Sequence, residues 1–108
     1  MQEIIDEKLK EVKIVEVKED PSYSGSKVFV TVELPLSGPS VDLEQFFQLD
    51  SMKQLAIKEA SKAINRSAGW SNVGPIRFFK EGEVIDSHYG DRKGADSVRV
   101  TYVCLGAL

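Results

Sequence analysis

The chain has 108 residues, of which 42% are hydrophobic and 29% are charged, and its formal net charge is −3. This length suits one domain over residues 1–108 that folds without disulfides or a structural metal. Its single cysteine and single histidine exclude an internal disulfide and a Cys/His zinc site, and no apolar run approaches the ~20 residues of a membrane span. We therefore expect a cytoplasmic protein with no cofactor and no membrane contact, and the acidic start of the chain does not resemble a signal peptide.

The charge is divided unevenly between the two halves of the chain. Residues 1–50 carry eleven acidic residues against five lysines, a net −6, whereas residues 51–108 carry nine basic residues against six acidic ones, a net +3. Such a distribution either serves solubility or pairs one copy of the chain with another.

The first half of the chain predicts two strands. Residues 9–18 are rich in β-branched side chains with charges between them, which is typical of an edge strand, and the sequence leaves open whether residues 2–9 form a short helix. After a turn over residues 21–26, Val28, Val30, Val32 and Leu34 alternate with polar residues up to Pro35. This period of two predicts a half-buried antiparallel strand.

Two helices are expected in the middle of the chain. Asp42 with Gln45 fits a capping box at the start of a short helix, and Ser51 with Gln54 fits the same pattern for a second helix that runs to about Arg66. The second helix is expected to place small and apolar residues on one face, at Met52, Ala56, Ala60, Ala63 and Ile64. Alanines on that face favour a close approach to a sheet.

The last third of the chain predicts three more strands. Residues 76–80 and 83–86 read as a hairpin around a tight turn at Glu81 and Gly82. Residues 98–105 predict a strand with two different faces. The even-numbered residues are apolar, and the odd-numbered residues change from polar to apolar along the strand. The ββααβββ order predicts an α+β fold, a two-layer sandwich of an antiparallel sheet of about five strands and one main amphipathic helix.

The single histidine and the single cysteine are residue types that often act in catalysis, but here a structural role explains each of them better. His88 shares a parity with Asp86, but no nucleophile accompanies them, so we favour a surface histidine over a general base. Cys104 lies on the apolar parity of the last strand and is expected in the core. The sequence thus nominates no catalytic residue.

Aromatic and aliphatic residues on the polar parity of the strands are candidates for protein contact. Phe29 lies opposite the apolar parity of its strand, and adjacent Phe78 and Phe79 must point to opposite faces. Trp70, expected in a loop, either covers an edge of the core or anchors a contact. The candidate interaction residues are Phe29, Trp70, Phe79, Val103 and Leu105.

Basic residues form a second set of candidates, for anions or nucleic acid. They comprise a helical ridge at i, i+4 spacing, a strand in which cations flank rings, and a basic pair in the glycine-containing loop over residues 89–96. These residues are Lys58, Lys62, Arg66, Arg77, Lys80, Arg92 and Lys93. For the helical ridge we favour a solvated helix face, and a long hairpin connection explains the loop equally well.

Three functions therefore compete. The preferred one is a small non-catalytic interaction module or accessory protein that forms a homo-oligomer or acts as an adaptor or inhibitor of another protein, because one helix layer leaves the far side of the sheet uncovered. The second is a nucleic-acid-binding module, which the overall acidity disfavours. The third is a small enzyme or ligand-binding protein centred on His88.

Overall fold

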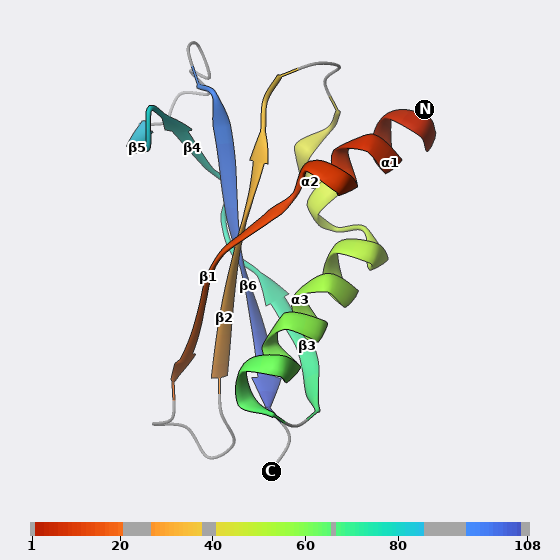
Figure 1. Cartoon of the computed structure of the whole chain (residues 1–108), viewed down its shortest axis with the longest axis vertical. Coiled ribbons are helices and arrows are strands. Elements are labelled where there is room, and N and C mark those ends of the chain that lie inside the picture. The colour runs from red at the N-terminus through yellow and green to blue at the C-terminus, as the bar shows by residue number, and fades with distance from the viewer. Residues whose placement is uncertain (1, 21–26, 38–40, 66, 86–94, 107–108) are drawn as a thin grey trace.

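The computed structural model describes residues 2–20, 27–37, 41–65, 67–85 and 95–106. Three helices and six strands follow one another along the chain (Figure 1). They are α1 (Gln2–Glu11), β1 (Lys13–Asp20), β2 (Lys27–Pro35), α2 (Leu43–Phe47), α3 (Asp50–Ile64), β3 (Ala68–Val73), β4 (Arg77–Lys80), β5 (Glu83–Ile85) and β6 (Ser97–Gly106).

All six strands belong to one antiparallel sheet in the order β1-β2-β6-β4-β5, with β3 also paired to β6. The long strand β6 pairs with β2 along one side, from Ser97 to Leu105. On its other side, β4 pairs with the first residues of β6 and β3 pairs with the last ones. The α+β class and the antiparallel sheet are confirmed, and β3 is the strand that the sequence analysis did not predict.

The core is built from the alternating residues of β2 and β6, as their period of two predicts. Val28, Val30 and Val32 are fully buried, and Leu34 is nearly so. Their partners across the ladder are Cys104, Tyr102, Val100 and Val98, which are equally buried. These two central strands therefore form the apolar floor on which the helices pack.

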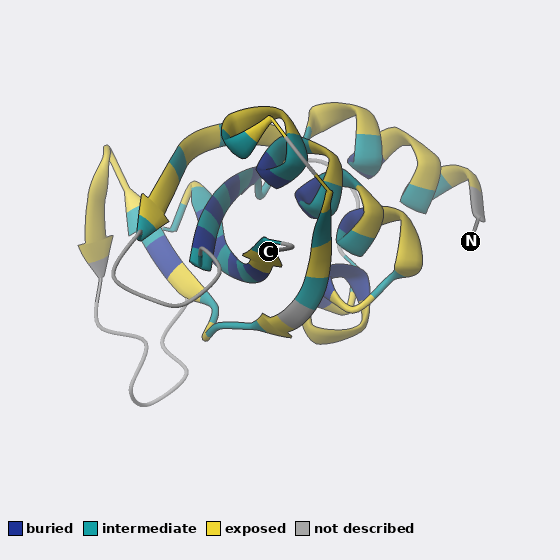
Figure 2. Cartoon of the chain, turned by 90° about the horizontal axis from the view of Figure 1, so that it is seen from below, coloured by how far each residue is buried: buried dark blue, intermediate teal, exposed yellow. Residues whose placement is uncertain are grey.

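Helix α3 lies on this floor and contacts β1, β2, β3 and β6. Met52, Ala56 and Ala60 are fully buried, and the two alanines allow the close approach that was expected. Ala63 is exposed and Ile64 half-buried, so the predicted face is narrower at its end. Figure 1 shows all three helices on one side of the sheet, and Figure 2 shows the sheet curling around the buried residues.

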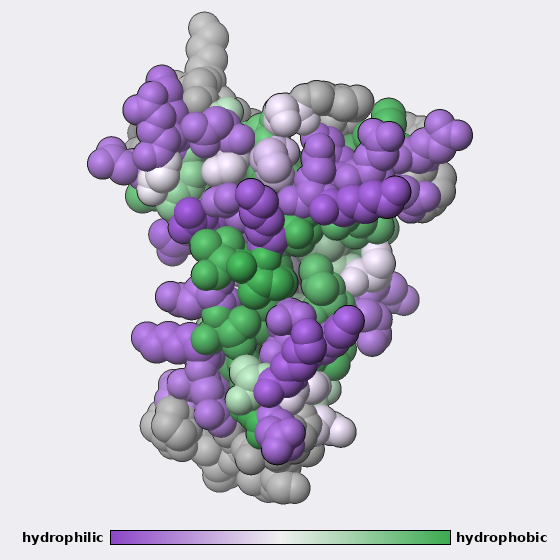
Figure 3. Space-filling view, viewed as in Figure 1, coloured by the Kyte–Doolittle hydropathy of each residue, from purple (hydrophilic) through white to green (hydrophobic). Residues whose placement is uncertain are grey.

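A β-bulge in β1 explains why neither parity of this segment is cleanly apolar. The register against β2 shifts by one residue between Ile14 and Glu16, which leaves Val15 unpaired. As a result Ile14 and Val17 both face the core, although they are three residues apart, while Val15 is 43% exposed. In Figure 3, which has the orientation of Figure 1, an apolar area bordered by polar residues lies in the middle of the molecule, between β1 and α3.

Several predicted boundaries are corrected. Helix α1 is formed and continues to Glu11, so the first strand begins at Lys13 rather than at residue 9. The Asp42 side chain accepts a hydrogen bond from the backbone N–H of Gln45, as the capping box predicts. The predicted Ser51 cap is wrong, because α3 begins at Asp50 and its N-cap, Leu49, makes no side-chain bond.

Residues with positive φ lie at the C-terminal end of α3 and in the turn between β4 and β5. Helix α3 ends at Ile64 rather than near Arg66, since Asn65 adopts a left-handed conformation with φ of 55°. The predicted tight turn between β4 and β5 is confirmed, with positive φ at both Glu81 and Gly82.

Candidate interaction surface

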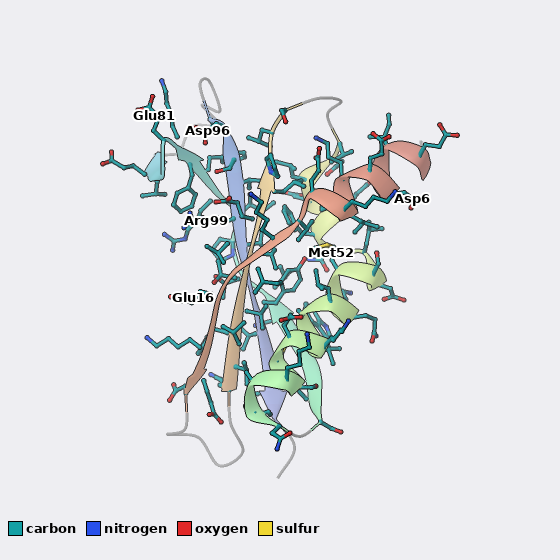
Figure 4. All side chains as sticks on the ribbon, in the orientation of Figure 1. Asp6, Glu16, Met52, Glu81, Asp96 and Arg99 are labelled. Carbon is teal, nitrogen blue, oxygen red and sulfur yellow. The ribbon has the colours of Figure 1, made fainter. Side chains whose placement is uncertain are left out.

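The sheet face that points away from α3 carries the residues of the polar parity. Because residues directly opposite one another in a ladder share a face, the register places them in one layer. We call this layer the outer face, and it includes Lys13, Glu16, Lys18, Asp20, Lys27, Phe29, Thr31, Glu33, Gly69, Asn72, Arg77, Phe79, Arg99, Thr101, Val103 and Leu105. Figure 4 shows Glu16 and Arg99 on the opposite side of the sheet from Met52.

An apolar centre lies toward one end of the outer face. Phe29 and Val103 are direct cross-strand partners and are half-buried, and Leu105 beside them is 47% exposed. Among the described residues, none of the helices covers these side chains. The centre is therefore a patch of three neighbouring apolar residues on a regular ladder.

Polar contacts organise the rest of the outer face. The hydroxyls of Thr31 and Thr101 are hydrogen-bonded at 2.9 Å, and Nε of Arg99 donates to the Glu33 carboxylate at 2.9 Å. The Arg99 guanidinium also lies 4.2 Å from the centre of the Phe79 ring. Phe79 is thus covered on one side by the protein's own cation, and this leaves Phe29, Val103 and Leu105 as the apolar contact area.

A shallow hollow of about 580 Å³ adjoins the apolar centre along β1. Its lining combines one aromatic ring, two hydroxyls and charges of both signs: Glu16, Lys18, Glu19, Asp20, Phe29, Thr31 and Thr101. The apolar patch is therefore bordered on this side by three carboxylates and one ammonium group, which form a polar rim like that of a protein interface.

Trp70 belongs to β3 rather than to a loop, and it faces the helix side of the sheet. It pairs with Cys104 in the ladder, its ring lies 6.0 Å from the Tyr102 ring, and the Lys53 ammonium lies 5.0 Å over it. Trp70 packs against the core, which places it away from the outer-face residues. Trp70 therefore shields an edge of the core from solvent, which is the first of its two predicted roles.

The four basic candidates that the structure describes do not gather on one surface. Lys58 and Lys62 are exposed on α3, whereas Arg77 and Lys80 are exposed on β4, at the other end of the molecule (Figure 1). Lys62 is paired with Glu59 at 3.5 Å. Phe78 between the β4 cations is buried in the core, so the two rings of β4 do not form an exposed run. Arg66, Arg92 and Lys93 lie outside the described residues.

Of the two residues considered for catalysis, the structure describes Cys104 alone. His88 lies outside the described residues. Cys104 is fully buried and unpaired, and burial raises the pKa of its thiol, which disfavours the reactive thiolate. Among the described residues no group of three His, Cys, Asp or Glu side chains is arranged to hold a metal ion. No helix in this part of the chain has the length and apolar character needed to cross a bilayer.

Sequence reasoning missed a second hollow, between α1 and α2. We call it the helix groove; it has a volume of about 420 Å³ and is lined by Ile4, Ile5, Val41, Asp42, Gln45, Phe46 and Leu49. The adjacent Ile4 and Ile5 in an otherwise charged segment were the signal that could have indicated it. Comparison of the chain with protein-family models, with curated proteins and with solved structures finds no match.

Proposed function

We propose that the protein is a non-catalytic interaction module whose outer face associates with a second copy of the chain. The observation that carries the proposal is the layering of the fold. All three helices pack on one side of the sheet, and the other side carries half-buried Phe29 and Val103 beside exposed Leu105. Contiguous exposed apolar residues with a polar rim are typical of protein contact sites.

The dimensions of the outer face suit a small dimer interface. The β2–β6 ladder runs over nine residue pairs, or about 30 Å at about 3.3 Å per residue. Four neighbouring strands add a width of about 19 Å, which gives about 600 Å² per copy. This is at the lower end of specific interfaces, which bury about 600 to 1,000 Å² per partner.

The charges beside the apolar centre favour a second copy as the partner. Glu16 and Lys18 lie on the same edge of the outer face with opposite signs. In a two-fold arrangement, Lys18 of one copy can lie opposite Glu16 of the other and vice versa, so these two positions are self-complementary. An adaptor or inhibitor that binds an unrelated protein does not need opposite charges placed to pair between two copies of its own surface.

The nucleic-acid alternative has weaker support from the geometry. Its basic residues are split between α3 and β4, and Arg99 already covers one side of the Phe79 ring on which a base would stack. Phosphate affinity depends on local cation density, and the chain has a net charge of −3. Binding to single-stranded oligonucleotides that falls steeply with added salt would favour this alternative.

Two equally exposed apolar residues allow a matched test. Leu105 on the outer face is 47% exposed and Val15 on the β1 bulge is 43% exposed. Sedimentation velocity should show that Leu105→Glu shifts the chain toward the single-copy species, because it places two carboxylates in the interface. Val15→Glu should leave the self-association of the wild type unchanged. Equal effects of the two variants, or no effect of Leu105→Glu, would contradict the proposal.

A further inference from the structure

The helix groove lies at the end of the molecule where α1 and α2 meet, apart from the outer face (Figure 1). Its walls are apolar, with Ile4 and Ile5 from α1 and Val41, Phe46 and Leu49 from α2 and its flanks. Phe46 is buried and the other four are half-buried, so the groove is a formed surface with apolar side chains at its base. Neither the outer face nor its proposed partner uses it.

The border of the groove is acidic. Asp42 lines it directly, and exposed Glu3, Asp6 and Asp50 are the chain neighbours of the lining residues Ile4, Ile5 and Leu49. Lys8, the basic residue nearest to Ile5 along α1, is buried; its ammonium donates to the Ser37 carbonyl and lies 3.6 Å from Glu11. That lysine points into the protein and does not line the groove. The groove therefore combines an apolar base with a negative border.

We infer that the helix groove binds a basic amphipathic segment of a partner protein. Apolar side chains three or four residues apart would enter between α1 and α2, and lysine or arginine side chains beside them would face Asp42 and the neighbouring carboxylates. An amphipathic helix in an apolar groove is a recurring mode of peptide recognition. The negative border disfavours an anionic amphiphile such as a fatty acid.

A second copy of α1 is the competing occupant, and its charge disfavours it. Its Ile4 and Ile5 are flanked by Glu3, Asp6 and Glu7. Inserting these isoleucines into the groove of another copy would bring carboxylates against an acidic border, which costs association free energy. The groove and the outer face therefore select different partners.

The probe is a 14-residue peptide of leucines and lysines designed as an amphipathic helix, titrated into the wild-type protein by isothermal calorimetry. We expect saturable 1:1 binding, whereas a scrambled peptide of the same composition should bind at least about tenfold more weakly, because it has no apolar face. Absence of saturable binding, or equal binding of the scrambled peptide, would overturn the proposal.

Charge variants locate the site. Asp42→Asn keeps the N-cap acceptor for Gln45 and removes the charge, so it should weaken binding about two- to fivefold, the range of one exposed ion pair. Glu83→Gln, exposed on β5, loses the same charge elsewhere and should bind as the wild type does. Gln45→Glu adds a carboxylate to the lining and should tighten binding. Equal affinities for all three variants would contradict the inference.

Apolar variants complete the test. Ile4→Ser should weaken peptide binding about tenfold, since it removes a buried aliphatic contact, and Val15→Ser should not. Far-UV circular dichroism controls for loss of α1. If Ile4→Ser instead lowers the solution mass of the protein, a second copy occupies the groove and the inference fails, whatever the outcome at Leu105.

Discussion

Replacing Tyr102 by Phe removes one hydroxyl from the centre of the core and leaves the ring in place. The hydroxyl donates to the Phe47 carbonyl at 2.6 Å, and both residues are almost fully buried. This bond joins β6 to the last turn of α2, the helix that lines the helix groove. Burial also raises the pKa of the Tyr102 phenol well above its usual value, so it remains a neutral donor.

The variant leaves the carbonyl of Phe47 buried without this donor. An unsatisfied buried acceptor costs about 1 to 3 kcal/mol. For 108 residues, an unfolding entropy of about 2.1 cal/mol/K per residue gives about 0.23 kcal/mol/K for the chain. The melting temperature should therefore fall by about 4 to 13 °C.

Differential scanning calorimetry measures the change, with Thr101→Val as the control. That variant removes the half-buried hydroxyl bond between Thr31 and Thr101, where water can replace the lost partner, and should cost less than about 1 kcal/mol. Hydrogen exchange should show lost protection in α2 for Tyr102→Phe only. A Tyr102→Phe protein that melts no lower than Thr101→Val would refute the role of this bond.

Three further variants test other parts of the structure. Lys8→Met should increase hydrogen exchange in α1, because it removes the bond to the Ser37 carbonyl, and unchanged protection would contradict that tether. The buried Cys104 thiol should resist iodoacetamide at pH 7 until the protein unfolds. Because burial raises the pKa of this thiol in the folded state above its ordinary 9.0, the free energy of unfolding should fall as the pH rises above about 9. Chemical denaturation should show that Cys104→Val lessens that fall. Gly82→Ala should lower the free energy of unfolding by about 1 kcal/mol, since Gly82 has a φ of +84°, and a neutral result in urea titration would argue against the left-handed turn.

The strands that could be predicted are those whose two faces differ. Burial alternates along β2 and β6 because one parity faces the helices and the other faces solvent. The side chains of the two parities therefore differ in hydrophobicity, and this difference can be seen in the sequence. In β1 the bulge at Val15 changes the parity in mid-strand, so a period of two holds only on either side of it. The mixed faces of this segment are the local signature of the bulge.

β3 could not be recognised from its own residues. Its glycine and asparagine have low strand propensity, and its place depends on pairing with the last residues of β6, far away in the chain. The indication lay in β6 instead. That strand runs over ten residues, and the four residues of β4 cannot accompany its whole length.

The candidate surface was predictable in part. The alternation placed Phe29, Val103 and Leu105 opposite the core, and the structure brings them together. It could not show that Arg99 lies over Phe79, because this contact requires the register between β4 and β6. The position of Trp70 against Tyr102 depended in the same way on the unrecognised strand.

The solution mass of the wild-type chain, measured by light scattering over a range of concentrations, tests the central proposal most directly. One copy has a mass of 12.0 kDa. Association through an apolar patch predicts twice this mass at high concentration, with little change on adding salt. A mass that stays at that of one copy at every concentration would contradict the assignment of the outer face as a contact between copies.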